Sequence, residues 1–479
     1  MIHFLLPGAG TSFGKGCAHS MPIGLMSSHQ SFKGLAGLSL LGGLLLAQPA
    51  LAQNQPSVPA AAQAIGLASD SLTLGATLQA VLDANPSITN LTELSAASAS
   101  RLSQTRAGFL PQVTGTATYT RIDPVVKLPF NGETLQFAPN NNYDFHLTAQ
   151  YLLFDFGKNE ATVKVAESQV QTAQDNITVA RRDLAFNAAQ VYYNILFMRE
   201  SIKVQDQQIA SLQAHRNEMQ KRVEGGVSTR FDVTTTDVRI TQAQNTRLDL
   251  QNQLRNQQVQ LARLLHKPAQ ADVPVKGHLT YDPQPVNVEA EVAKGSNNRP
   301  EVKLARDAEN AAEMQARLIE KGNLPSLGAG IQAGAKNGYI LPDINRIRFN
   351  TVGVVQLSVP IYDGNKNKKQ RVEAEANARA AVARTADMQE QIRADVRQAA
   401  NNMDFSQARY ENAQQQVAQA TLALGKARDR YRYGVGQNLD VLDAETQLAQ
   451  ARLALAQAVY SYTLGQFQLR RATGEQIWQ

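Results

Sequence analysis

The same order of sequence patterns occurs twice along the chain, and this duplication restricts its possible folds more than any other feature. In each copy a helical stretch ends at a proline and two stretches of alternating side chains follow. A helical pattern of about seventy residues, a glycine turn and another long helical pattern complete the copy. Corresponding landmarks lie 207 to 214 positions apart: Pro86 and Pro300, Pro111 and Pro325, Gly157 and Gly364, Gly226 and Gly434, Asp232 and Asp440. Such a repeat predicts two copies of one supersecondary unit whose long helices pack side by side.

The first 52 residues are expected to be a signal peptide. An apolar run at 35–47 follows Lys33 and precedes a small-residue cleavage site at 50–52. This is the arrangement of a secretory signal, and the run is too short to span a bilayer. A Gln-, Pro-, Ala- and Ser-rich lead-in at 53–71 is expected to follow.

Composition excludes several classes of function. Translation from Met21 or Met26 instead of from the first residue would also keep the signal. The only cysteine, Cys17, lies in the part that would be removed. The mature chain is therefore expected to have no catalytic, metal-binding, disulfide-bonded or lipid-anchored cysteine. Without Lys15 and Lys33, the 47 Lys and Arg residues fall to 45 against 41 Asp and Glu. Because no basic block with interleaved aromatics occurs, no nucleic-acid partner is expected.

Alternating side chains predict one β-hairpin in each copy, at about 110–155 and 325–362. Residues 113–120 place threonines on one face, and residues 143–151 alternate large apolar with polar side chains. This pattern is typical of a sheet with one face toward lipid and the other toward water. A Pro- and Asn-rich loop at 123–142 is expected between the strands of the first hairpin.

The second hairpin has the same alternation with smaller side chains. Ala and Gly dominate its first strand, and its return strand is expected at 349–361, with Val352 and Val354 on the polar face. Four aromatic residues near the loop ends suit an interfacial girdle: Tyr119, Tyr143, Tyr339 and Phe349. Since a hairpin has two open edges, all four strands are expected to need partners in other chains. A soluble β-sandwich hairpin is the alternative.

Sevenfold spacing of apolar residues predicts long helices with coiled-coil seams. No Gly or Pro interrupts 158–224, so this helix would be roughly 100 Å long at 1.5 Å per residue. The first repeat is expected at 72–266, with helices at 158–224 and 232–266. A linker at 267–297 is expected to follow. The second repeat is expected at 298–474, with helices at 365–433 and 440–471, and a tail at 475–479 completes the chain.

The duplicated plan resembles the TolC family of outer-membrane channels over nearly the whole mature chain. The motifs that carry the resemblance are Asn85-Pro86, Phe109-Leu110-Pro111, Phe154-Asp155-Phe156-Gly157 and the segment from Tyr433 to Ala444, which reads YGVGQNLDVLDA. The resemblance implies a mainly α fold with a membrane β-barrel part: a homotrimer with a twelve-stranded β-barrel continuous with a twelve-helix periplasmic α-barrel.

The same resemblance assigns roles to residues near the two glycine turns. It implies that Asp440 and Asp443 form the periplasmic constriction, and that Asp232 and Tyr431 make gate contacts between helical hairpins. The family's arginine is absent, because Gly436 stands at its position; Arg230 or Arg432 is a candidate replacement. Asp232 and Asp440 are equally suited to cap the returning helices, and Tyr431 to continue a sevenfold seam.

The function implied is a passive exit channel in the outer membrane of a Gram-negative bacterium, serving efflux or type I secretion. Its implied partners are outer-membrane lipid, a periplasmic adaptor and an inner-membrane pump of RND, ABC or MFS type, with the adaptor docking near the turns that contain Gly225, Gly226, Gly434 and Gly436. The four histidines after the signal show no ligand spacing and no catalytic motif is present, so no metal, cofactor or enzymatic activity is expected. The alternative is a periplasmic or surface coiled-coil scaffold or adhesin.

Overall fold

The computed structural model describes residues 72–478 except 131, 272 and 342, so the expected signal peptide and lead-in lie outside the described residues. The helices of the described part are α1 (Leu74–Ala84), α2 (Pro86–Arg106), α3 (Lys158–Glu224), α4 (Arg230–Leu264), α5 (Val288–Asn298), α6 (Pro300–Glu320), α7 (Lys366–Arg432) and α8 (Asn438–Thr473). The strands are β1 (Gln112–Arg121), β2 (Lys127–Phe130), β3 (Glu133–Gln136), β4 (Asn141–Phe154), β5 (Ser326–Lys336) and β6 (Arg348–Ser358). No helix in this part of the chain combines the length and hydropathy needed to cross a bilayer.

The short helices repeat at a constant interval. Moving α1 and α2 forward by 214 positions reproduces the bounds of α5 and α6. In each pair a proline occupies the first position of the second helix, where its missing N–H costs no hydrogen bond. α5 begins at Val288, so the last ten residues of the segment 267–297, which was expected to be a linker, are helical.

The long helices α3 and α7 each contain 67 residues and start at a left-handed residue. Asp155 holds the start of α3, because its carboxylate accepts hydrogen bonds from the backbone N–H groups of Gly157 (3.0 Å) and Asn159 (2.7 Å). Asp363 accepts from Asn367 N–H (2.8 Å) in the same way at α7. The aspartate of each strand-to-helix motif thus satisfies orphan donors of the following helix.

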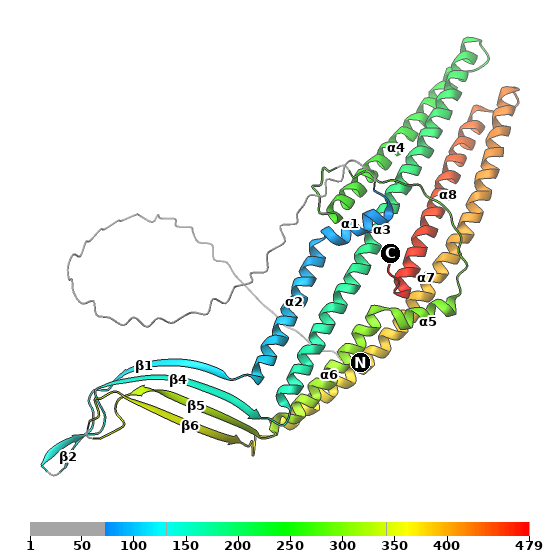
Figure 1. The fold of residues 1–479 in the computed structure, drawn as a ribbon. Helices are drawn as coiled ribbons and strands as arrows, with labels where there is room; N and C mark the ends of the chain where they lie inside the picture. Colours follow the sequence, from blue (N-terminus) through cyan, green and yellow to red (C-terminus); the bar gives the residue numbers. More distant parts are fainter. Residues whose placement is uncertain (1–71, 131, 272, 342, 479) are drawn as a thin grey trace, which may run out of the picture. The chain divides into compact units, whose positions relative to one another are not determined.

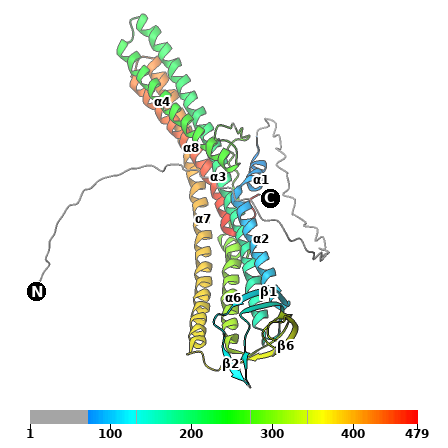
Figure 2. The same cartoon turned by 90° about the vertical axis from the view of Figure 1, so that its left-hand side faces the viewer.

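After a short turn, each long helix is followed by a second helix that packs beside it. This gives two helical hairpins, α3–α4 and α7–α8. α2 and α6 pack on either side of α3, and α6 also packs on α7 (Figures 1 and 2). At the contact of α3 with α1, Ala185, Ala188 and Ala189 are fully buried together with Ile195. Small side chains here allow close approach of the helix backbones.

The four longer strands form one curved antiparallel sheet in the order β1-β4-β5-β6 (Figure 1). The two hairpins therefore pair with each other through β4 and β5. The expectation that all four strands need partners in other chains is therefore wrong for β4 and β5, which lie inside the sheet. Among the described residues, β1 and β6 are the edge strands, so one chain presents two open edges instead of four.

The loop expected at 123–142 contains structure of its own. β2 and β3 pair as a small antiparallel hairpin, and β4 already begins at Asn141. The second return strand is shorter than expected, since β6 ends at Ser358 and not at 361.

The chain between the repeats crosses the long helices as a strap. Leu72 pairs with Val275 in a parallel bridge, and the Tyr192 hydroxyl of α3 donates to the Lys276 carbonyl. Further along, the Tyr281 ring stacks on Tyr410 of α7 with 3.6 Å between ring centres. The strap therefore joins the α3 side of the fold to the α7 side.

Candidate functional site

The two turns that close the helical hairpins differ in how they use glycine. Gly226 and Gly434 have φ values of +72° and +77°, a left-handed conformation that favours glycine. Gly225 has φ −80° and therefore needs no such freedom. At Gly436 a β-carbon would lie 3.0 Å from Arg430 Cβ and 3.1 Å from Tyr431 N. Any larger residue at this position, arginine included, would require the last turn of α7 to move.

Asp232 caps the start of α4. Its Oδ2 accepts hydrogen bonds from the hydroxyls of Thr229 (2.7 Å) and Ser228 (3.1 Å), while Thr229 Oγ1 accepts from the Asp232 N–H (3.3 Å). This is a reciprocal capping box. One carboxylate oxygen, Oδ2, is therefore engaged within its own turn of the chain.

Asp440 and Asp443 both lie exposed on the first turns of α8. Asp440 Oδ2 accepts from the backbone N–H of Gln437 (3.2 Å), so it also helps to cap its helix. Asp443 is ion-paired across helices, with Arg239 Nη2 of α4 at 3.2 Å from its Oδ1. The two aspartates thus share an exposed helix end, but in one chain one of them already has a cationic partner.

Tyr431 lies between the two helical hairpins. Its ring packs edge-on against His215 of α3 (5.5 Å between ring centres), and the Arg222 guanidinium lies 4.9 Å from the ring centre. Arg222 also donates to the backbone carbonyls of Tyr431 (3.5 Å) and Arg432 (3.3 Å). At the Tyr431 contact, Arg222 therefore links the hairpins, and neither the Arg230 nor the Arg432 side chain makes such a contact among the described residues.

Sequence reasoning missed a buried polar link beside these residues. Asn438, the first residue of α8, accepts from His215 Nε2 (2.8 Å) and donates to the Asp232 carbonyl (3.2 Å) and to Thr236 Oγ1 (3.5 Å). His215, Thr236 and Asn438 are all buried. One amide thus joins α8 to both helices of the other hairpin; we call His215, Thr236 and Asn438 the inter-hairpin link.

The duplication contains a signal that points to this link. At the interval of 208 between the turns, His215 corresponds to Ala423 and Asn438 to Arg230, both exposed. Forming and closing a helical hairpin therefore does not require these residue types. A comparison of the two copies would have marked the pair as specific to the contact between hairpins.

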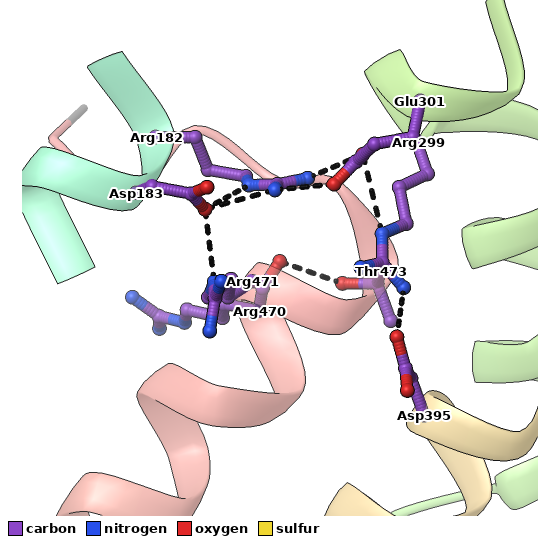
Figure 3. A network of polar contacts seen from close by, with 8 residues as sticks. All are labelled: Arg182, Asp183, Arg299, Glu301, Asp395, Arg470, Arg471 and Thr473. Atoms are coloured by element: carbon purple, nitrogen blue, oxygen red, sulfur yellow. Dashed lines mark hydrogen bonds and ion pairs between the residues drawn. The ribbon is translucent and has the colours of Figure 1, made fainter. Parts of the chain in front are cut away.

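A second polar network joins four helices far from the turns (Figure 3). Arg182 of α3 is buried and forms a bidentate pair with Glu301 of α6 (2.7 and 2.5 Å), and also binds Asp183 (2.9 Å). Asp183 accepts from Arg471 of α8 (3.0 Å) as well, and Arg299 at the start of α6 binds Asp395 of α7 (2.7 Å). Burial opposes ionisation of Glu301, but the hydrogen bonds and charge of Arg182, with the charge of Arg299, lower its pKa to about 2. The network therefore stays charged at any ordinary pH.

The sheet has one polar and one apolar face. Its polar face is hollowed near the helices by a cavity of about 740 Å³. Strand residues lining it include Gln112, Thr148, Gln150, Gly330, Gln332 and Gln356. The opposite face exposes large apolar side chains, among them Val113, Phe145, Leu147, Ile331, Val355 and Leu357. In the register these apolar residues occupy alternate positions on all four strands.

The aromatic residues expected to form a girdle lie at the loop end of the sheet. The rings of Tyr119 and Tyr143 are 5.3 Å apart, and the Tyr339 hydroxyl donates to the Phe349 carbonyl (3.2 Å). In the described part of the chain, no three His, Cys, Asp or Glu side chains come close enough together to hold a metal ion.

Comparisons with known proteins give a consistent result. The sequence model of the family described as "Outer membrane efflux protein" matches residues 77–266 and 294–475. Outer membrane efflux protein BepC of Brucella suis is 21% identical over 376 residues, covering 77% of this chain and 78% of BepC. Outer membrane protein TolC of Escherichia coli is 25% identical over 394 residues, covering 78% of this chain and 76% of TolC. The solved structure of VceC from Vibrio cholerae has a TM-score of 0.71 at 20% identity, covering 84% of this chain and 96% of VceC.

Proposed function

This chain belongs to the outer membrane efflux protein family, and we propose that it forms a passive exit duct through which an efflux or type I secretion system discharges its cargo. The family is one of channels, and its members lie in the outer membrane of Gram-negative bacteria with a long periplasmic part. The observation that carries the proposal is the sheet: one face is apolar and exposed, the other is polar and hollowed. A sheet of this kind suits a wall between lipid and water.

The number of chains follows from the strand edges together with the family. Each chain contributes four strands with two open edges, β1 and β6. An open edge in lipid leaves backbone groups without hydrogen-bond partners, so the edges must be closed by other chains. Channels of this kind form trimers, and three chains give a twelve-stranded β-barrel continuous with twelve helical columns in the periplasm.

Energy and selectivity for cargo come from partners in this proposal. Channels of the family work with a periplasmic adaptor and an inner-membrane pump, and here the pump is of RND, ABC or MFS type. The adaptor docks at the turns containing Gly225, Gly226, Gly434 and Gly436. Val227, Phe231, Tyr433 and Val435 at these turns are at least two-thirds exposed, which offers an apolar surface to a partner.

The periplasmic entrance is assigned to the exposed first turns of α8. Three copies of Asp440 and Asp443 would place six carboxylates in one ring and favour cations. Asp232 and Tyr431 make the gate contacts in this proposal. The Asp232 carbonyl accepts a hydrogen bond from Asn438, and the Tyr431 ring contacts Arg222 and His215. The inter-hairpin link and Arg222 then hold the entrance where the family arginine is absent.

Planar-bilayer recording tests the duct and its entrance together. Purified protein should give stable single-channel steps, and Asp440→Asn with Asp443→Asn should reduce its preference for cations in a salt gradient. Asp249→Asn, which removes an exposed carboxylate from the middle of α4, is the matched control and should leave the reversal potential unchanged. Silence from elongated oligomers would favour a coiled-coil scaffold or adhesin, and unchanged selectivity in the double variant would reject the ring.

A further inference from the structure

Three of the four charged side chains of the sheet lie at one level. Strands β1, β4, β5 and β6 together contain four Asp, Glu, Lys or Arg residues: Arg121, Asp144, Lys336 and Arg348. In the register Asp144 lies opposite Lys336, and Lys336 lies opposite Arg348. Directly opposed residues project from the same face of a sheet. Asp144, Lys336 and Arg348 therefore form a single row across three strands, which we call the charged row.

The charged row lies on the polar face, at the loop end of the sheet. Thr118 continues it on β1, and the next row toward the helices consists of Thr116, His146, Gly334 and Asn350. Beyond that row, the polar face contains uncharged residues as far as the cavity near the helices. A solute that moves along this face toward the loops meets its strongest charges last.

The charges within the row do not cancel. Asp144 Oδ1 contacts Nδ1 of His146, and the His146 ring is buried against Gly334, where a β-carbon would come within 2.9 Å of His146 Cδ2. Asp144 is thereby held toward its own strand. Two cations then remain against one carboxylate in each row.

The two cations are held loosely enough to meet a ligand. Lys336 Nζ lies 5.5 Å from the centre of the Tyr339 ring, and Arg348 Nη2 lies 3.7 Å from Asp343 Oδ2 in the neighbouring loop. The Asp343 side chain is half exposed, so this long ion pair is weak. Both cationic groups therefore have donors left for a solute.

We propose that Lys336 and Arg348 form a binding site for anionic groups, either chloride or the carboxylate or phosphate of a leaving solute. The proposal rests on the proposed function, because it requires the polar face to line the duct. In a trimer six cations would face three Asp144 carboxylates, with three half-exposed Asp343 carboxylates in the neighbouring loops. A guanidinium binds carboxylate or phosphate in a bidentate manner. The outer mouth would then have the opposite charge preference to the aspartates at the periplasmic end.

Reversal potentials test the site in the intact channel. Lys336→Gln with Arg348→Gln should raise the cation-to-anion permeability ratio several-fold. Lys336→Arg with Arg348→Lys keeps both charges and should retain the original ratio. Arg121→Gln is the matched control, because it removes one cation at the same end of the sheet but from the other face. The proposal is overturned if Arg121→Gln has as large an effect as the double variant, or if neither has any.

A thiol-reaction experiment separates this site from the duct function. In a Cys17→Ser background, Thr116→Cys places a thiol one row inside the charged row. Relative to their rates with a free thiol in solution, an anionic methanethiosulfonate should modify it several-fold faster than a cationic one, and Lys336→Gln with Arg348→Gln should abolish that ratio. Equal rates before and after the substitutions would refute the site. An intact ratio without conductance in bilayers would instead refute the duct and leave the site standing.

Discussion

Folding keeps the carboxyl group of Glu301 ionised far below its ordinary range. Burial raises its pKa, but Arg182 and Arg299 outweigh this and lower the pKa from 4.5 to about 2. A lowered folded-state pKa contributes stability above the unfolded pKa, and this contribution is lost as the pH falls from about 4.5 toward 2. The shift corresponds to about 3 kcal/mol. The described fold should therefore lose thermal stability in acid partly through this one group.

Replacing Glu301 with glutamine tests that account. Glu301→Gln leaves Arg182 buried without its main partner, which typically costs about 3–5 kcal/mol. We expect a lower melting temperature at pH 7 and a weaker fall in melting temperature between pH 5 and pH 3 than in the parent chain. Glu313→Gln on the same helix breaks an exposed pair with Arg317 and should cost no more than about 1 kcal/mol. Equal losses in both variants would contradict the role of burial.

At the scale of the element, the start of α8 depends on the inter-hairpin link. Asn438→Ala removes its hydrogen bonds to His215 and to the Asp232 carbonyl and leaves buried polar groups unpaired, at about 1–3 kcal/mol. Hydrogen exchange in the first two turns of α8 should become faster, because local opening there becomes less costly.

A contact between the same two helices provides the control. Gln207 of α3 accepts a hydrogen bond from Arg452 of α8 (2.9 Å), but both groups are exposed and lie farther from the turns. Gln207→Ala should leave exchange at 438–445 unchanged. If both variants accelerate exchange there equally, the link has no special position among the α3–α8 contacts.

At the scale of the whole molecule, the edge strands decide how chains associate. Since β1 and β6 have open edges, cysteines on them in separately tagged chains should be joined by a short thiol cross-linker. Thr116→Cys on β1 and Val352→Cys on β6 form the test pair. Gln332→Cys lies opposite Val352 on the central strand β5 and should not join to Thr116→Cys of another chain. Monomeric protein without cross-chain products would rule out the shared sheet.

The sequence determined the long helices and the four longer strands, because local physics and duplication specify them, whereas α5 and the β2–β3 hairpin were missed. Prolines at 86 and 300, the run without Gly or Pro at 158–224, and sevenfold seams predict the helices wherever they lie in space. Composition alone assigned Val288 to a linker. Adding the constant interval of 214 positions to the start of α1 at Leu74 would have given the start of α5 at Val288. The resemblance to a channel family likewise rested on motifs that repeat in order.

Only the tertiary structure decided which elements meet. That β4 pairs with β5, that Arg239 binds Asp443, and that His215 contacts Asn438 across 223 positions all depend on which faces pack together. A local pattern gives the face of a helix or strand but not the identity of its distant neighbour. The exposed carboxylates could be named only through the resemblance to a channel family, and neither their partners nor the inter-hairpin link could be found from the sequence for this reason.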